Sequence, residues 1–200
     1  HYGTTVGHGS LREEVGARDS YKPATREQVA QMKFLAAQAL RDGAVGIGFG
    51  INYDPGASYE EVLALFEVAA AHNVPCHLHV RYKGSVFPEN FIAALQEVIT
   101  AAAVTGAAAQ VVHMTSSAVR AMDTALAMLD GARAHGIDLA ADVYPYLANS
   151  TNLASAIYDP GWEERFGGIT YSDIELVETG ERLTKETFEK YRREGAQVIT

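Results

Sequence analysis

Short apolar segments alternate with longer amphipathic segments along most of this chain. Four apolar segments are predicted to be strands, over residues 44–51, 76–80, 109–114 and 138–144. Four amphipathic segments are predicted to be helices, over residues 25–41, 58–72, 88–105 and 119–134, with Thr25 and Ser58 as N-caps. Such alternation implies parallel βαβ units with right-handed crossovers. The pattern predicts an α/β fold, either a doubly wound sheet or part of a (β/α)8 barrel of the TIM type.

The final part of the chain departs from this alternation. Residues 147–184 show no regular period and contain Pro160 and several glycines. A stretch of this length exceeds a plain connection, so we expect a long loop or an insertion. Residues 184–193 are typical of a short helix that precedes a strand at residues 197–200. Because the chain starts without methionine and stops in this strand, we expect residues 1–200 to be the central part of one barrel domain whose flanking segments are missing.

Composition narrows the class of protein. The chain has 200 residues, 48% of them hydrophobic, which excludes a largely disordered protein. Its formal net charge of −9 disfavours nucleic-acid binding, because phosphate backbones are repelled by an acidic surface. Cys76 is the single cysteine, so no intrachain disulfide can form, and we expect a reducing, cytoplasmic location. No apolar run reaches the ~18 residues of a membrane span.

Side-chain parity separates two faces of the segment 76–80. The apolar residues at positions 76, 78 and 80 share a face, which suits the side of a strand covered by helices. The opposite face carries His77, His79 and Arg81, and it must point into the barrel or a site. Ionisable side chains on the inner face of a buried strand are costly unless they are paired or bind a metal.

The neighbouring strands carry polar residues at the same end. His113 lies at the C-terminal end of one strand, and Asp142 and Tyr144 share a parity on the next. Glycines at 46, 48 and 50 leave room for a ligand on the interior face. In a parallel barrel, these strand ends converge at one mouth, where active sites lie.

Two neutral imidazoles on adjacent strand ends form a sensible half of a zinc site. Each histidine could instead be a hydrogen-bonded core residue, and His77 could replace His79 as the ligand. His79 is nearer the C-terminal end of its strand. The glycines of the segment 46–50 lie inside a strand rather than at a strand-to-helix turn, which disfavours dinucleotide binding.

Five segments resemble motifs of one known family, in order along the chain. They are GHGSLR at 7–12, GFGINYDPG at 48–56, HVR at 79–81, HMTSS at 113–117 and DVYPYLANST at 142–151. On these segments the chain resembles the N-acyl-D-amino-acid deacylases of the amidohydrolase superfamily, which include the D-aminoacylases and the N-acyl-D-glutamate deacylases. Residues 152–200 match no motif of that family.

The resemblance implies a zinc-dependent hydrolase on a (β/α)8 barrel. Its small-molecule substrate would be an N-acyl-D-amino acid, cleaved at the N-acyl amide bond to a carboxylate and a free D-amino acid. His79 and His113 would be ligands of one or two zinc ions, and the substrate would contact Tyr53, Tyr144 and Ser150. Arg81 is a further candidate for substrate binding, from its position more than from the family.

The chain also departs from the family pattern. The H-x-H metal motif near the first strand and the bridging ligand are absent from it. The aspartate that acts as general base is expected beyond Thr200, so no catalytic residue is assigned. Thr115 stands where some members have a lysine that contacts the substrate carboxylate, so the substrate preference is open.

Two other functions fit the same sequence. A dihydroorotase-like cyclic-amide hydrolase would be favoured by a strand-end lysine that can be carbamylated, and none lies on the predicted strands. A metal-free barrel fragment that acts only as a binding or structural module is the second. No feature of the sequence predicts an oligomeric state.

Overall fold

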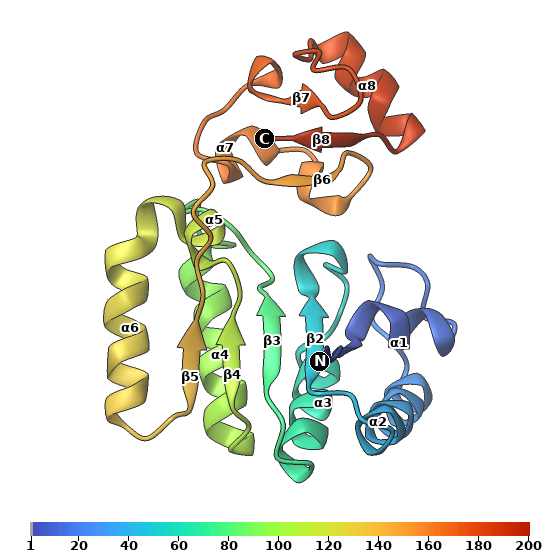
Figure 1. Ribbon diagram of the computed structural model, residues 1–200, viewed down its shortest axis with the longest axis vertical. Coiled ribbons are helices and arrows are strands. Elements are labelled where there is room, and N and C mark those ends of the chain that lie inside the picture. Colours follow the sequence, from blue (N-terminus) through green and yellow to red (C-terminus); the bar gives the residue numbers. More distant parts are fainter. Residues whose placement is uncertain (1) are drawn as a thin grey trace.

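The computed structural model describes residues 2–200, which form two parts (Figure 1). The strands of the first part are β1 (Val6–Gly7), β2 (Ile47–Gly50), β3 (Cys76–His79), β4 (Ala109–Val111) and β5 (Leu139–Ala141). Its helices are α1 (His8–Glu14), α2 (Arg26–Arg41), α3 (Tyr59–Ala71), α4 (Phe91–Thr105), α5 (Met114–Ala118) and α6 (Met122–Ala134), with 3-10 turns η1 (Ile51–Tyr53) and η2 (Val119–Ala121). The second part contains β6 (Ser150–Asn152), η3 (Ala156–Tyr158), α7 (Trp162–Arg165), η4 (Tyr171–Asp173), β7 (Glu175–Leu176), α8 (Lys185–Glu194) and β8 (Gln197–Ile199).

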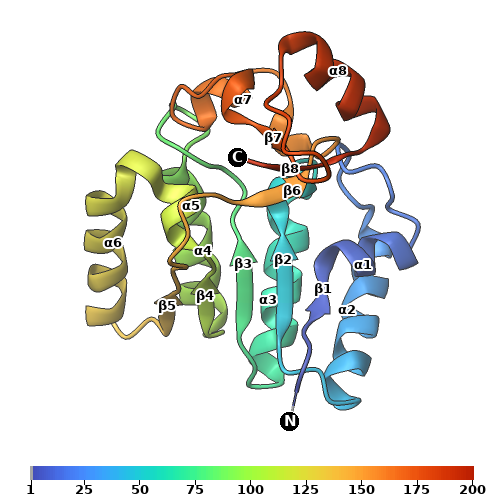
Figure 2. The ribbon, with the colours of Figure 1, turned by 45° about the horizontal axis from the view of Figure 1, so that its top comes forward.

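The first part is a parallel sheet in the order β1-β2-β3-β4-β5. The long helices lie along one face of this sheet, and the strand arrows point toward the second part (Figures 1 and 2). Each strand pairs with the next one along the chain, as expected for an arc of a barrel. The prediction of parallel strand-helix units is confirmed.

Helix boundaries follow local capping chemistry. The Thr25 hydroxyl accepts a hydrogen bond from the backbone of Gln28, and the Ser58 hydroxyl accepts one from Glu61, so both predicted N-caps are confirmed. Helix α4 begins after the N-cap Asn90, slightly later than expected, and ends at Gly106, whose φ of 75° suits glycine. The predicted helix over 119–134 is divided into η2 and α6.

The strands are shorter than their apolar patterns suggested. After β4, residues 112–114 were expected to extend the strand, but α5 begins at Met114 instead. His113 adopts a left-handed conformation with φ 39°, which stops the strand and starts the helix.

The predicted parity of the strands holds within the sheet. The face covered by helices carries a fully buried set that includes Ile47, Phe49, Cys76, Leu78 and Val111. The opposite face carries the partly buried Gly48, Gly50, His77 and His79. Gly48 packs closely against β1, because a Cβ there would lie 2.8 Å from Oγ1 of Thr5 and would displace that side chain.

The second part is more ordered than the long loop expected from the sequence. Its strands form an antiparallel sheet in the order β6-β8-β7. It has a hydrophobic cluster of its own, which includes Tyr158, Trp162 and Phe188. The strand expected at residues 197–200 forms as β8, but it joins this sheet rather than the parallel one.

The second part lies over the C-terminal ends of the parallel strands (Figure 2). None of the helices within residues 2–200 is long and apolar enough to cross a membrane.

Candidate metal and substrate site

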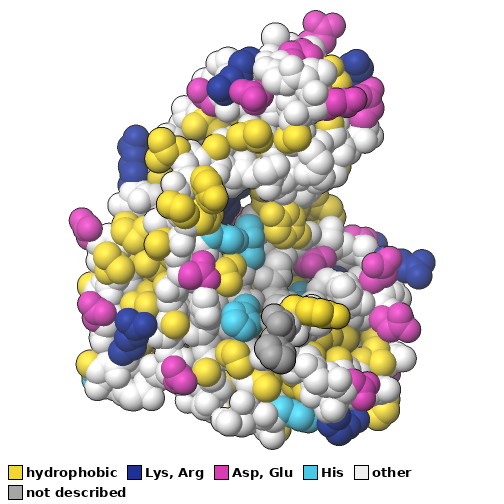
Figure 3. All heavy atoms as spheres, viewed as in Figure 1, with side chains coloured by type: hydrophobic (Ala, Val, Ile, Leu, Met, Phe, Trp, Pro, Cys, Tyr) yellow, Lys and Arg dark blue, Asp and Glu magenta, His cyan; other side chains and the backbone are white. Residues whose placement is uncertain are grey.

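A pocket of about 380 Å³ lies where the parallel strands end beneath the second part. Figure 3 shows histidine side chains beside the hollow between the two parts. The pocket is lined by residues of the strand-end loops, of the segment that leads to β6 and of the second part: Tyr53, His79, Lys83, His113, Ser116, Tyr144, Tyr146, Ala148, Asn149, Ser150 and Ile157. Five of the six predicted site residues therefore meet in one pocket.

His79 is the last residue of β3, and it lines this pocket. Its ring centroid is 4.6 Å from that of His113, with the two rings nearly perpendicular. Nε2 of His79 is buried and has no hydrogen-bond partner within the described residues. Burial, the neighbouring His113 and the charge of Lys83 together lower the pKa of His79 to about 3. The imidazole is therefore neutral at physiological pH, the form that binds metal.

His113 is oriented by contacts at its backbone and at one ring nitrogen. Its backbone N–H donates to Oδ1 of Asp142 at 2.5 Å, and the other carboxylate oxygen of Asp142 accepts from Gln110 at 2.5 Å. Nδ1 lies 3.1 Å from Oγ of Ser116, and that hydroxyl donates to the carbonyl of His113. With Nδ1–H donating to Ser116, Nε2 keeps its lone pair for a metal. Burial also lowers the pKa of His113.

The two histidines fit part of a zinc site. Both are neutral imidazoles at one strand-end level, and His79 leaves a buried nitrogen without a partner. Catalytic zinc sites use about three protein ligands. Residues 2–200 contain no cluster of three or more histidine, cysteine, aspartate or glutamate side chains that could hold a metal. The described residues therefore offer two candidate donors, fewer than a catalytic zinc site needs.

Aromatic and hydroxyl side chains surround the histidines. The Tyr53 ring meets His79 edge-on at 5.0 Å, and the Tyr144 ring lies 6.2 Å from that of His113. The Tyr53 hydroxyl is 3.3 Å from Oγ1 of Thr151 in β6, so it links the two parts. Ser150, also in β6, lines the same pocket from the second part.

Arg81 does not line this pocket. Its side chain is 5% exposed, and the guanidinium forms two hydrogen bonds of 2.9 and 2.8 Å with Glu97 in α4 and donates to the carbonyl of Ala57 at 2.7 Å. The parity that grouped Arg81 with the histidines is wrong, because β3 ends at His79 and the chain bends beyond it. A role for Arg81 in substrate binding stays a prediction without geometric support.

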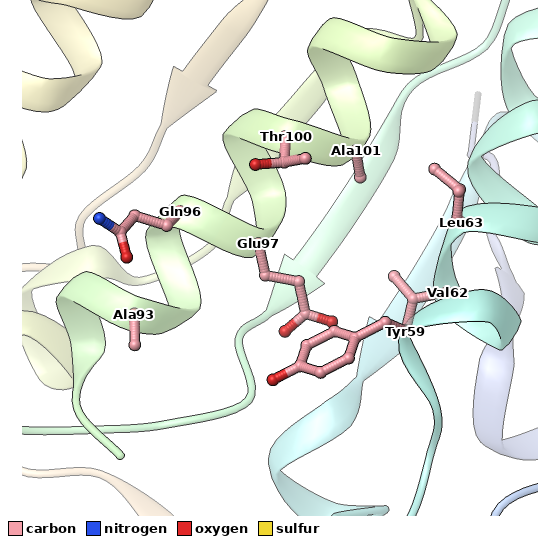
Figure 4. A pocket seen from close by; sticks show the side chains of 8 residues that line it. All are labelled: Tyr59, Val62, Leu63, Ala93, Gln96, Glu97, Thr100 and Ala101. Carbon is pink, nitrogen blue, oxygen red and sulfur yellow. The ribbon is translucent and has the colours of Figure 1, made fainter. Parts of the chain in front are cut away.

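Glu97 belongs to a different hollow, between α3 and α4 on the outer side of the sheet. This groove has a volume of about 310 Å³, and Figure 4 shows Glu97 and Tyr59 approaching each other across it. The guanidinium of Arg81 lies 4.8 Å from the Tyr59 ring centroid. Arg81 therefore ties the loop after β3 to the helix layer.

Lys83 was not singled out in the sequence and is the main addition from the structure. It lies in the loop after β3, four positions beyond His79, and lines the pocket of the histidines. No strand pattern covers this loop, so only its short distance in sequence from His79 could have drawn attention to it.

A second buried polar cluster lies away from the pocket, between α1 and α3. Glu61 is fully buried and accepts hydrogen bonds from Arg12 at 2.7 and 2.9 Å. His8 Nε2 lies 2.7 Å from the same carboxylate, and Asp54 lies beside it at 3.6 Å from Arg12. The first two motif segments, 7–12 and 48–56, therefore meet through these side chains.

Two curated proteins of Alcaligenes xylosoxydans xylosoxydans are similar to this chain in sequence. An N-acyl-D-glutamate deacylase is 37% identical over 154 residues, and a D-aminoacylase is 32% identical over 154 residues. Each match covers 74% of this chain but 30% of the relative, so the chain corresponds to less than a third of their length. No family model matches the chain.

Solved structures of the same enzymes share its fold. The N-acyl-D-glutamate deacylase of Bordetella bronchiseptica matches 98% of this chain and 43% of its own, with 30% identity and a TM-score of 0.78. In sequence and in structure, the chain is similar to the N-acyl-D-amino-acid deacylases of the amidohydrolase superfamily. A D-aminoacylase structure, 24% identical, matches 98% of the chain and 42% of its own with a TM-score of 0.73, which supports the fold.

The fold prediction is confirmed as part of an α/β barrel. The structural match spans nearly the whole chain, so it includes most of residues 147–200, where no motif was found. The second part is thus a shared structural feature of these relatives rather than an irregular connection.

Proposed function

We propose that the full-length protein is a zinc-dependent hydrolase that cleaves the N-acyl amide bond of an N-acyl-D-amino acid. The chain covers less than half of each relative, so the proposal concerns the whole protein. Among the relatives, the Bordetella deacylase is described with zinc and a phosphonate that mimics the tetrahedral intermediate, and a D-aminoacylase with a binuclear metal centre.

The observation that carries this proposal is the pair of neutral imidazoles in the pocket. Nε2 of His79 is buried without a partner, and the His113 ring, 4.6 Å away, is oriented through Ser116. A buried polar atom without a partner is costly, and a metal ion removes that cost. His79 and His113 would therefore hold one or two zinc ions together with ligands from other segments.

The rest of the pocket suits a polar, amide-containing substrate. Bound zinc would lower the pKa of a water molecule toward ~7 and polarise the amide carbonyl. Tyr53, Tyr144 and Ser150 place hydroxyl groups at the pocket, where they would donate hydrogen bonds to the substrate and fix its position. Asp142 is engaged by Gln110 and His113, so we assign it to positioning His113 rather than to proton transfer.

A cyclic-amide hydrolase of the dihydroorotase type is the alternative on the same scaffold. Lys83 reaches the pocket from the loop after β3, and a carbamylated lysine could serve as a metal ligand there. Comparison of the hydrolysis rates of N-acyl-D-amino acids and cyclic amides separates the two functions. A clear preference for cyclic amides would replace the deacylase proposal.

The metal assignment is tested with His79→Ala and His113→Ala in the full-length protein. Each variant should lose tightly bound zinc and more than about 1,000-fold in hydrolysis, because a ligand is removed from an already small set. Zinc is measured by elemental analysis after dialysis. His135→Ala is the control, since His135 is exposed and its Nδ1 lies 2.8 Å from the carbonyl of Gly131, in its own helix. Full zinc content in both ligand variants would contradict the assignment of the ligands. Hydrolysis of the substrate by a metal-free preparation of the native protein would contradict zinc dependence.

A further inference from the structure

Lys83 is a buried cation at the edge of the pocket. Its side chain is 4% exposed, and Nζ lies 4.3 Å from the centroid of the Phe166 ring in the second part. Within residues 2–200, Nζ forms no ion pair. Burial lowers the pKa of Lys83 to about 8. Because this pKa is above 7, the ammonium stays mostly protonated at neutral pH.

The pocket around Lys83 has an unbalanced charge. Lys83 is the one lysine or arginine among the described residues that line it, and no aspartate or glutamate does so. The other polar groups are hydroxyls, an amide and imidazoles that are neutral at physiological pH. A buried ammonium without a counter-ion is costly, and a face-on aromatic ring offsets that cost only in part.

The backbone of Lys83 is fixed on both sides. The carbonyl of Arg81 accepts a hydrogen bond from Nδ2 of Asn52 at 2.5 Å. The N–H of Gly84 donates to Ser117 at 2.8 Å, and its carbonyl accepts from Phe91 at 2.9 Å. Gly84 has φ 70°, and a Cβ there would lie 2.4 Å from the carbonyl of Arg165, so this loop packs against α7 with no room for another residue type.

We propose that Lys83 binds the carboxylate of the substrate and thereby selects N-acyl amino acids over neutral amides. A held ammonium with three donors, beside neutral hydroxyl donors, is a site for an oxygen anion. The ammonium has no lone pair for a metal, so it does not compete for the zinc proposed at the histidines. The identity of the anion as a substrate carboxylate rests on the proposed function.

The test compares two ligands that differ only at this group: N-acetyl-D-leucine and its carboxamide, N-acetyl-D-leucinamide. Binding is measured by calorimetry with the metal-stripped full-length protein, and hydrolysis with the zinc-loaded protein. Lys83→Met should weaken binding of the carboxylate and raise its KM about 10- to 100-fold. The carboxamide should bind equally well to both proteins. Lys83→Arg should restore most of the affinity for the carboxylate.

Lys190→Met is the matched control, because Lys190 also lies over an aromatic ring, that of Tyr191 at 4.7 Å, but outside the pocket. If Lys83→Met proves unstable, Lys83→Gln retains polarity and provides the same comparison. Equal weakening of the carboxylate and the carboxamide by a folded variant would overturn the role of Lys83 while leaving the deacylase proposal intact. Lys83-dependent carboxylate binding without hydrolysis by the native protein would instead overturn the deacylase proposal alone.

Discussion

Two clusters of buried ionisable side chains lie in this chain, and they differ in one respect. Between α1 and α3, Arg12 and His8 converge on a carboxylate, that of Glu61. In the pocket above β3 and β4, two histidines and Lys83 are buried together, and no carboxylate lines the cavity within the described residues. The first cluster contains its own counter-charges, although Nδ1 of His8 and Nε of Arg12 make no hydrogen bond within residues 2–200. The lining of the second, over the same residues, contains none.

This difference indicates different roles. Both carboxylate oxygens of Glu61 are bound, by Arg12, by His8 and at 3.3 Å by the backbone of Ala24, so the cluster joins three segments of chain. Burying charges is tolerated when partners satisfy them. The pocket lacks such partners, and groups left unsatisfied in a cavity are those that a metal or substrate can satisfy. Stability should therefore depend on the first cluster, and ligand binding on the second.

The largest effect on stability is expected from Glu61→Gln. Loss of this charge leaves Arg12 buried without its partner, so the free energy of unfolding should fall by about 3–5 kcal/mol. In contrast, His79→Gln should change it by less than about 1 kcal/mol in the metal-free protein, because Nε2 of His79 makes no hydrogen bond to lose. Urea denaturation of the full-length protein measures both. Equal losses would remove the distinction between the clusters.

The next largest effect is the pH dependence that Glu61 confers. Burial raises its pKa, but the hydrogen bonds and charges of His8 and Arg12 outweigh burial and lower it from 4.5 to about 2. A lowered carboxyl pKa stabilises the fold fully above about 4.5, and this contribution is lost as the pH falls toward 2. The shift corresponds to about 3 kcal/mol.

The difference in unfolding free energy between the native protein and Glu61→Gln should therefore shrink between pH 5 and pH 2. The pKa of Asp54 is raised, chiefly by burial, so its titration changes stability in the opposite direction. Both proteins contain Asp54, so comparing them reduces the contribution of Asp54 to the measured difference. If this difference in unfolding free energy stays constant from pH 5 to pH 2, Glu61 has the same pKa in the folded and unfolded protein, and the proposed stabilisation is wrong.

The smallest effect is expected at Tyr53. Tyr53→Phe removes a weak hydrogen bond of 3.3 Å to Thr151 and one hydroxyl donor of the pocket. Stability should change by less than about 1 kcal/mol, and KM for an N-acyl-D-amino acid should rise less than about tenfold. Tyr21→Phe is the control, because its hydroxyl makes a similar contact, 2.9 Å from Asp159, outside the histidine pocket. Equal KM changes in both variants would remove Tyr53 from the substrate contacts.

Much of the fold was predictable because its signals are local. The caps Thr25 and Ser58 hydrogen-bond within their own first turns, and the alternation around Cys76 and Leu78 reflects two faces of one strand. The convergence of His79 and His113 also followed, since neighbouring parallel strands end at the same edge. The strand ends were less predictable, because His113 leaves the extended conformation inside an apolar run.

Tertiary structure decided where the side chains beyond the strands point. Past His79 the chain bends, so Arg81 turns to Glu97 in the helix layer while Lys83 turns to the pocket. Parity stops being informative where the strand stops. The antiparallel sheet of the second part was not predicted either. Its strands are only two or three residues long, too short to show an alternation of apolar and polar residues. The sequence by itself determined the layered α/β architecture and the paired histidines, which depend on short-range chemistry. The choice of partners for Arg81, Lys83 and Glu61 depended on contacts between distant segments, which only the folded chain brings together.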